Sequence, residues 1–189
     1  MKLIHLIARL VLCMILAGGI LTMETADAQQ KTDGASTPPA NPADVASIDA
    51  IISATYDSIS GAAGKKRDWN RLRSLFIPGA RLIPTGKNPE GKIAAQVLEV
   101  DGYVARAGDY LEKNGFFEQE IARRTEQFGH IAHVFSTYES RHKADDLKPF
   151  MRGINSIQLM YDGKRWWIVT IYWQQESVED PIPEKYLKK

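Results

Sequence analysis

The stretch MRGINSIQLMYDGKRWWIVTIYWQQE, residues 151–176, contains two apolar runs separated by Asp162-Gly163. Asp-Gly between apolar runs is typical of a β-hairpin turn, because both positions tolerate a positive φ. The second run, Trp166 to Trp173, has almost no polar residue on either face. A strand exposed on one side would alternate polar and apolar residues, so this strand is predicted to be covered on both sides.

Pairing around the turn assigns the side chains of the hairpin to two faces, because successive residues of a strand point to opposite sides. One face is predicted to carry, among others, Asn155, Trp166, Thr170 and Tyr172. The other face is predicted to carry Trp167, Ile171 and Trp173.

Length, charge and cysteine content limit the possible functions. A chain of 189 residues suits one domain with an appendage. The net charge of +1 excludes a strongly basic nucleic-acid footprint, so no nucleic-acid partner is expected. The only cysteine, Cys13, lies in an N-terminal apolar run, so we expect neither a disulfide nor a cysteine metal site in the mature chain.

Residues 1–28 have the pattern of a Sec-type signal peptide. Lys2 and Arg9 give a positive start, and an apolar run follows at 10–21. Ala26-Asp27-Ala28 fits the small-x-small cleavage pattern. We therefore expect cleavage after Ala28 and a periplasmic or secreted product that no longer contacts a membrane. The alternative is an uncleaved anchor, although the run is short for a bilayer.

The remaining chain divides into a linker, a domain and a tail. Residues 29–43 are rich in Pro, Ala, Thr and Asp, which predicts a flexible linker. Helical spacing follows Asn41, Asp68 and Asp101, each a suitable N-cap, and strands are expected at 116–128, 129–140 and in the hairpin. The charged stretch 116–128 could also form a helix. Residues 177–189 form a charged tail that we expect to fray.

Helices followed by strands indicate an α+β fold with the helices on one face of an antiparallel sheet. Three phrases at 75–80, 129–134 and 162–168 (LFIPGA, GHIAHV and DGKRWWI) follow one another in an order found in a known family. From 44 to 176 the chain resembles the nuclear transport factor 2-like (NTF2-like) superfamily, in its SnoaL-like or ketosteroid-isomerase-like branch. The resemblance implies a cone-shaped, strongly curved antiparallel sheet wrapped around the N-terminal helices. It also implies an apolar pocket at one end and frequent homodimers.

In this family the Trp-x-Ile pair points inward, which implies that the face carrying Trp166 lines the pocket. The expected ligand-pocket residues are Trp69, Tyr103, His133, Asn155, Trp166, Thr170 and Tyr172. The expected homodimer interface is the opposite, apolar face, with Trp167, Ile171 and Trp173. For Trp166 and Tyr172 an ordinary core position is the alternative.

His133 is the main candidate for catalysis, with Tyr172 as a second group. An imidazole titrates near neutral pH, so His133 could act as a general acid or base; the alternative is an ordinary histidine. No carboxylate stands in an apolar run that would raise its pKa, which weakens an isomerase assignment. No metal or cofactor is predicted, because His130 and His133 fall on opposite faces of a strand.

Three functions remain open at this point. The favoured one is a secreted or periplasmic domain that binds a small apolar molecule in its cone. The second is an enzyme that performs general acid/base chemistry on a carbonyl compound through His133. The third is a structural dimerisation domain without activity. Because members of this superfamily have many activities, the fold does not decide among them.

Overall fold

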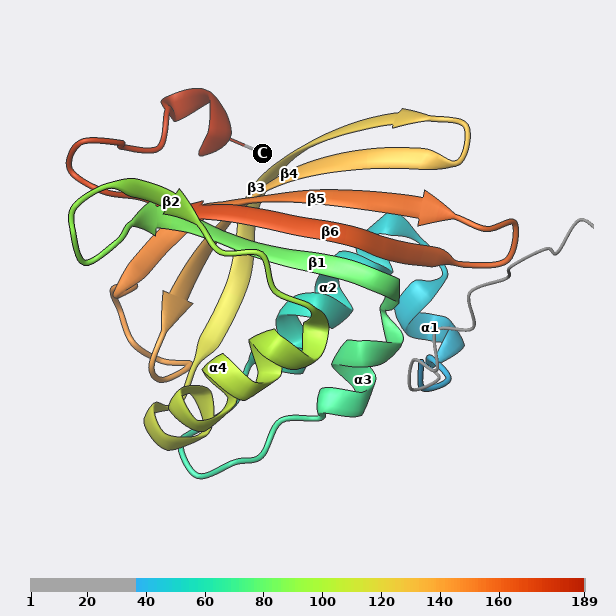
Figure 1. The fold of residues 1–189 in the computed structure, drawn as a ribbon, viewed down its shortest axis with the longest axis horizontal. Helices are drawn as coiled ribbons and strands as arrows, with labels where there is room; N and C mark the ends of the chain where they lie inside the picture. Colours follow the sequence, from blue (N-terminus) through green and yellow to red (C-terminus); the bar gives the residue numbers. More distant parts are fainter. Residues whose placement is uncertain (1–36, 189) are drawn as a thin grey trace, which may run out of the picture. The chain divides into compact units, whose positions relative to one another are not determined.

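The computed structural model describes residues 37–188, which form an α+β domain with a curved, six-stranded sheet (Figure 1). The predicted signal peptide and residues 29–36 of the predicted linker lie outside the described residues. The strands are β1 (Phe76–Lys87), β2 (Ile93–Ala95), β3 (Phe117–Phe128), β4 (Ile131–Arg141), β5 (Met151–Tyr161) and β6 (Trp166–Gln175). The helices are α1 (Pro42–Val45), α2 (Ile48–Ile59), α3 (Trp69–Ser74), α4 (Val100–Asn114) and the short 3-10 helix η1 (Glu184–Tyr186).

The sheet has the strand order β2-β1-β6-β5-β4-β3. All neighbours are antiparallel except β1 and β6, which are parallel, so the expectation of a purely antiparallel sheet is wrong at this pair. In this pair Arg81 to Thr85 lie beside Thr170 to Gln174 and run in the same direction. Pro78 and Gly79 lie where the register with β6 shifts, and Gly79 has a φ of 78°.

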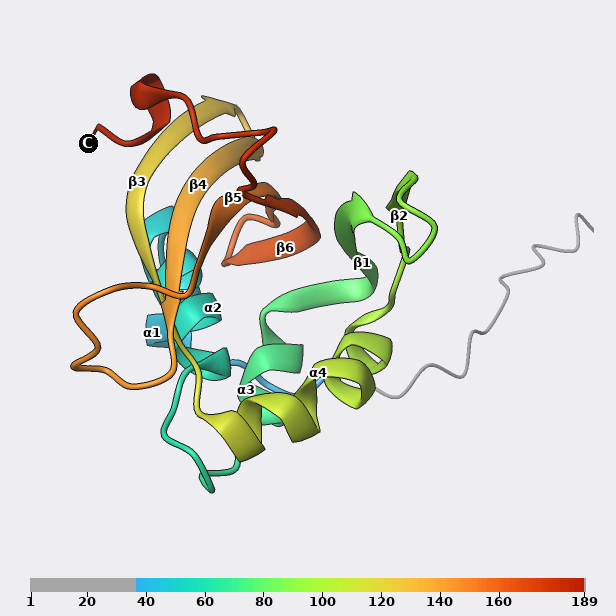
Figure 2. The same ribbon diagram turned by 90° about the vertical axis from the view of Figure 1, so that its left-hand side faces the viewer.

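The helices lie on the concave side of the sheet. Figure 2 shows β3, β4 and β5 arching over α2, with α3 and α4 on the same side. Ile51 and Ile52 of α2 are almost fully buried, as are Leu75, Val134 and Ile168, and all belong to one apolar core. Removal of these side chains from water is the main stabilising contribution to the domain.

The observed helix starts agree in part with those predicted from the sequence. Asn41 and Asp68 cap α1 and α3 through their side-chain oxygens, as predicted. The single helix expected after Asn41 is divided in two, because Ser47 adopts an extended conformation and caps α2 separately. Asp101 is not a cap: α4 begins at Val100, two residues earlier than a cap at Asp101 would place it, and Asp101 lies in its first turn.

The predicted hairpin is confirmed, with a loop at 162–165 between β5 and β6. Its pairing contains a β-bulge that the sequence does not indicate. Leu159 lies opposite Ile168, whereas Gln158 lies opposite Thr170, so Val169 is an extra residue in β6. Because one inserted residue reverses the orientation of every following side chain, the predicted faces are wrong from Thr170 onward.

The C-terminal tail is ordered against the sheet rather than frayed. The Thr137 hydroxyl donates a hydrogen bond to the Tyr186 carbonyl oxygen at 2.6 Å. The rings of Phe135 and Tyr186 lie 5.0 Å apart, centroid to centroid. Phe135 and Thr137 point away from α2, so η1 covers part of the outer, convex face of the sheet (Figure 1).

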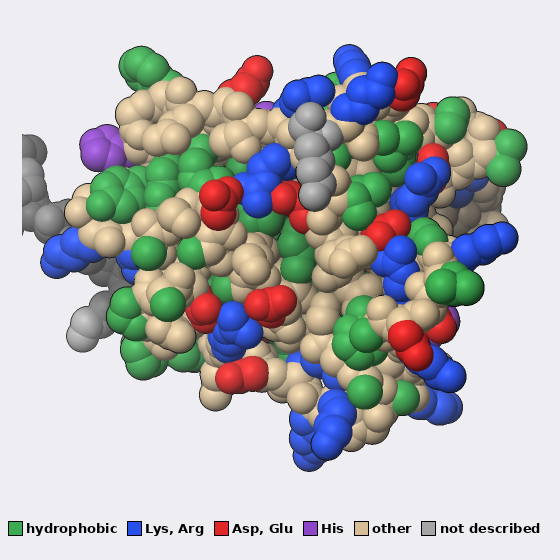
Figure 3. Space-filling view, turned by 180° about the vertical axis from the view of Figure 1, so that it is seen from behind, with side chains coloured by type: hydrophobic (Ala, Val, Ile, Leu, Met, Phe, Trp, Pro, Cys, Tyr) green, Lys and Arg blue, Asp and Glu red, His purple; other side chains and the backbone are tan. Residues whose placement is uncertain are grey.

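The described surface has no dominant charge on the face shown in Figure 3, where acidic and basic side chains are interspersed. Among residues 37–188, no helix is both long and apolar enough to cross a lipid bilayer. The same residues contain no cluster of three or more His, Cys, Asp or Glu side chains arranged to hold a metal ion.

Candidate functional site

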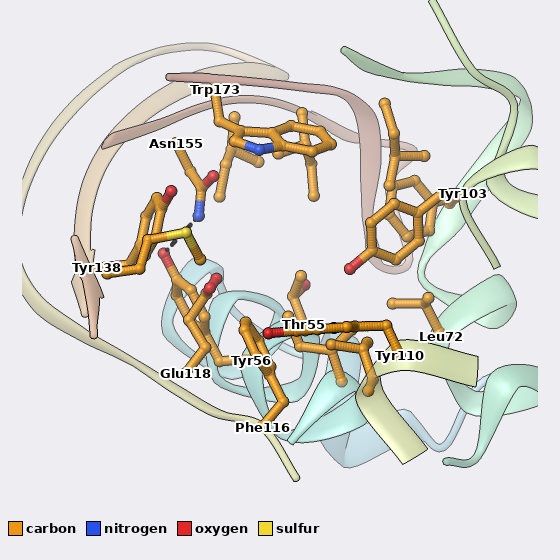
Figure 4. Close-up of a pocket in the computed structure, with 17 residues that line it drawn as sticks. Thr55, Tyr56, Leu72, Tyr103, Tyr110, Phe116, Glu118, Tyr138, Asn155 and Trp173 are labelled. Atoms are coloured by element: carbon orange, nitrogen blue, oxygen red, sulfur yellow. Dashed lines mark hydrogen bonds between the residues drawn. The ribbon is translucent and has the colours of Figure 1, made fainter. Parts of the chain in front are cut away.

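A cavity of about 220 Å³ lies between the helices and the concave face of the sheet (Figure 4). Residues from α2, α3 and α4 and from five of the strands contribute to its wall. Most of the wall is apolar, and aromatic rings make up a large part of it. These rings belong to Tyr56, Phe76, Tyr103, Tyr110, Phe116, Tyr138 and Trp173.

Glu118 is the only charged residue that lines this cavity. It lies at the start of β3, directly after the turn at Gly115, and is paired with Ser140 of β4. The Ser140 hydroxyl donates a hydrogen bond to Glu118 Oε2 at 2.8 Å. Burial raises the pKa of Glu118 to about 7, and the nearby polar groups of Ser140 and Asn155 oppose the rise. At neutral pH this carboxyl group can therefore both accept and donate a proton.

The neighbouring acid on the same strand has a different environment. Glu120 accepts hydrogen bonds from the Ser136 hydroxyl and, at 2.6 Å, from Nε of Arg123, so a cation neutralises its charge. Glu118 has no ion-pair partner among the described residues. An ionised carboxylate without a counter-charge is costly in apolar surroundings. Of these two acids, Glu118 is thus the one available to a bound molecule.

Hydroxyl groups surround the cavity end of Glu118. Tyr56 Oη lies 2.7 Å from Ser136 Oγ, and Asn155 Nδ2 donates to Tyr56 Oη at 3.1 Å (Figure 4). Burial holds the pKa of Tyr56 above its usual value, and the same cause raises the pKa of Tyr103. Both phenols therefore stay protonated at neutral pH. Because the Ser136 hydroxyl donates to Glu120, the Tyr56 hydroxyl donates to Ser136 Oγ, and the Tyr103 hydroxyl is the one that can donate a hydrogen bond to a bound molecule. Figure 4 shows the hydroxyl of Tyr103 pointing into the cavity.

No protein-family model matches the sequence, and no curated protein matches it either. Solved structures do match. A Nostoc punctiforme protein of unknown function with a cystatin-like fold has a TM-score of 0.51, is 11% identical and aligns over 68% of this chain and 87% of its own. An NTF2-like protein of unknown function from Silicibacter pomeroyi has a TM-score of 0.47 and 17% identity, over 69% and 94% of the chains.

A provisionally assigned ketosteroid isomerase from Parabacteroides distasonis gives a TM-score of 0.45 and 12% identity, over 69% and 89% of the chains. The likeness to the Nostoc punctiforme protein indicates a cystatin-like fold. A strongly curved sheet wraps around N-terminal helices and leaves an apolar cavity on the concave side, as the sequence resemblance implies. At such low identity the likeness concerns the fold alone.

The structure brings two of the predicted pocket residues to the cavity, Tyr103 and Asn155. Trp69 packs beside Gly108 of α4 and does not line the cavity. Trp166 is a core residue that is 8% exposed, the alternative that the sequence left open.

His133, Thr170 and Tyr172 lie on the convex face, so their predicted pocket position is wrong. Val134 and Ser136 of β4 are buried and face α2. Successive residues of a strand point to opposite sides, so His133 lies on the other side. His133 Nε2 lies 3.0 Å from Ser156 Oγ there. The bulge in β6 moves Thr170 and Tyr172 to the same face. Catalysis in the cavity by His133 and Tyr172 is therefore excluded by their placement.

The predicted interface residues are also divided by the bulge. Ile171 and Trp173 line the cavity instead of the convex face, and the rings of Trp173 and Tyr103 meet edge to face with their centroids 6.2 Å apart. Trp167, which precedes the bulge, lies on the convex face under the guanidinium group of Arg165. Of the three residues, only Trp167 remains available for an interface on that face.

Glu118 is not among the predicted site residues, and the expectation that no carboxylate has a raised pKa is wrong. A signal was present: Phe116 and Phe117 directly precede Glu118 at the start of a strand. Strand alternation places Glu118 on the same side as Phe116, which is buried. Tyr56, Tyr110 and Tyr138 also line the cavity, at positions that helix or sheet packing explains equally well from the sequence.

Proposed function

We propose that this NTF2-like domain binds one small, mainly apolar molecule in its cavity, with a polar group of that molecule next to Glu118. The observation that carries the proposal is a single acid facing an otherwise apolar, aromatic cavity of about 220 Å³. Since a water molecule takes about 30 Å³ of liquid, this space corresponds to roughly seven waters, or a molecule with one ring.

The composition of the wall supports this proposal. Ligand pockets are mostly apolar and contain a few converging polar groups that fix orientation. Here Asn155 and the phenols of Tyr56 and Tyr103 supply those groups. A purely structural dimerisation domain is less well supported, because it has no use for a carboxyl group whose burial costs stability.

Binding can be tested with neutral one-ring compounds such as benzyl alcohol, followed by calorimetry and thermal shift. Ile171→Trp fills the cavity from β6, and we expect it to weaken binding at least about tenfold, since the ligand and the added ring compete for the same volume. Tyr172→Trp introduces the same side chain at the next position, on the convex face, and should leave the affinity unchanged.

Equal affinities of the Ile171→Trp and Tyr172→Trp variants would contradict binding in this cavity. Circular dichroism and the melting temperature of each variant establish that the fold is retained, because overpacking can cost about 1–3 kcal/mol.

A second candidate function is general acid/base catalysis on a carbonyl compound. It is favoured by the pKa of Glu118, which is about 7, and by the protonated phenols beside it. In such a reaction the Glu118 carboxylate accepts a proton from the carbon next to the carbonyl. A phenol such as that of Tyr103 donates a hydrogen bond to the oxygen as negative charge develops on it.

This chemistry is detected without knowledge of the natural substrate by exchange of the α-hydrogens of cyclohexanone in D₂O. We expect the protein to accelerate exchange measured by proton NMR, and Glu118→Gln to remove the acceleration by at least about a hundredfold. His133→Ala, on the convex face, should retain the wild-type rate. A wild-type rate no higher than that of buffer alone would contradict catalysis by this route and leave ligand binding as the function.

Export and self-association belong to the same proposal. The pattern at 1–28 supports cleavage after Ala28 and a periplasmic or secreted product. Homodimers would use the convex face of the sheet, where Trp167 and the exposed Tyr172 lie.

A further inference from the structure

The cavity contains one acid and no base, and aromatic rings border it. Glu118 is its only charged lining residue, and no lysine, arginine or histidine is among the others. Tyr103 and Tyr110 from α4 and Trp173 from β6 direct their rings toward the same space (Figure 4). Charge and ring placement together limit the kind of molecule that fits.

An anionic ligand is disfavoured in such a cavity. It would meet the carboxyl group of Glu118 without a cation to offset either charge, and it would lose its hydration. A cationic ligand is favoured in this cavity. An ammonium group supplies the counter-charge that Glu118 lacks within the described chain, and the faces of aromatic rings attract cations further.

We propose that the ligand of this cavity is an amine: a one-ring apolar molecule whose ammonium group pairs with the Glu118 carboxylate and packs against the surrounding rings. The proposal rests on the ligand-binding function above and names its ligand class. A neutral alcohol could use the phenol and amide groups equally well, but it would leave Glu118 without a counter-charge, so the two classes differ in affinity.

Glu118 must be ionised to pair with an amine, so the groups around it matter for the pH dependence. The neighbouring phenols remain neutral, because burial raises the pKa of Tyr56, Tyr103 and Tyr138. The charge of Glu120 is neutralised by Arg123. The titratable and charged side chains that surround Glu118 are Tyr56 and Asp57 of α2, Tyr103 and Tyr110 of α4, Glu120 and Arg123 of β3, and Tyr138 of β4.

The test compares benzylamine, benzyl alcohol and benzoate, which have similar size and differ in charge. Calorimetry at pH 8 with the mature chain should show benzylamine binding at least about tenfold more tightly than benzyl alcohol, and benzoate more weakly than both. The affinity for benzylamine should fall by up to about tenfold for each pH unit below 7, because Glu118 must then release a proton. Titrations in two buffers of different ionisation enthalpy measure that proton release.

Glu118→Gln should remove the preference for benzylamine and leave the affinity for benzyl alcohol within about twofold. Glu126→Gln makes the same substitution at an exposed position of β3 and should retain the preference. If Glu118→Gln does not fold, the pH profile and proton release of the wild-type protein still decide the question.

Tighter or equal binding of benzyl alcohol by the wild-type protein overturns the amine assignment and leaves the binding function intact. A preference for benzylamine that survives in folded Glu118→Gln also overturns it, because another group then recognises the cation. If none of the three compounds binds, both the binding function and the amine assignment fail.

Discussion

At the scale of single residues, Glu118 couples the stability of the fold to pH. The pKa of its carboxyl group is about 7 in the folded chain, against a usual value of 4.5. Between these values the folded chain holds a proton that the unfolded chain has lost. The contribution of Glu118 to the free energy of unfolding therefore decreases as pH rises from about 4.5 to about 7, and is constant above that range.

Glu118→Gln removes this dependence, because glutamine stays neutral. We expect the variant to be more stable than the wild type at pH 8, by on the order of 3 kcal/mol, since each pKa unit between the two states is worth about 1.4 kcal/mol. The two proteins should be close in stability at pH 4.5. Urea titrations at both pH values measure the difference. If Glu118→Gln changes the free energy of unfolding by the same amount at pH 8 and at pH 4.5, folding does not raise the pKa of Glu118.

At the scale of secondary structure, the sequence predicts the strands of the hairpin better than it predicts which side of the sheet each side chain faces. The apolar runs on both sides of Asp162-Gly163 specify the hairpin, and Trp166 and Ile168 point inward as expected. The extra residue Val169 is not encoded by a local signal, because neighbouring β-branched residues suit either face equally well. One bulge therefore moved Trp173 into the cavity and Tyr172 out of it.

The candidate acid was missed for a related reason. Periodicity identifies which residues share a face of β3, but not how deeply that face is covered. Glu118 is enclosed because α2, α4 and β5, which are distant in sequence, meet at the start of the strand. Its neighbour Glu120 has the same residue type and pairs with Arg123 instead. Three-dimensional packing, rather than local sequence, thus determines which of the two acids has a raised pKa.

At the scale of the whole described domain, the C-terminal segment controls how much of the convex face is exposed. Tyr186 packs on Phe135, and the Lys185 carbonyl oxygen accepts a hydrogen bond from Arg124 at 3.0 Å. Truncation after Glu176 uncovers this part of the sheet. We expect the truncated chain to self-associate at lower concentration than the chain that extends to Lys189, because apolar surface is exposed.

Sedimentation velocity over a range of concentrations measures this change. A chain that ends at Leu187 retains η1 and serves as the control. If truncation after Glu176 leaves both the sedimentation profile and the melting temperature unchanged, the segment does not protect the convex face. The same experiment gives the oligomeric state of the chain that extends to Lys189, for which we expect a homodimer.

The central claim is that Glu118 faces a ligand cavity and has a pKa near neutral pH. The most direct measurement is the titration of its side-chain carboxyl carbon by ¹³C NMR between pH 4 and pH 9, with the Glu118→Gln variant to assign the signal. The account predicts a midpoint at about 7 for Glu118. A midpoint for Glu118 near 4.5 would contradict the account, because the carboxyl group would then be solvated rather than enclosed by the cavity.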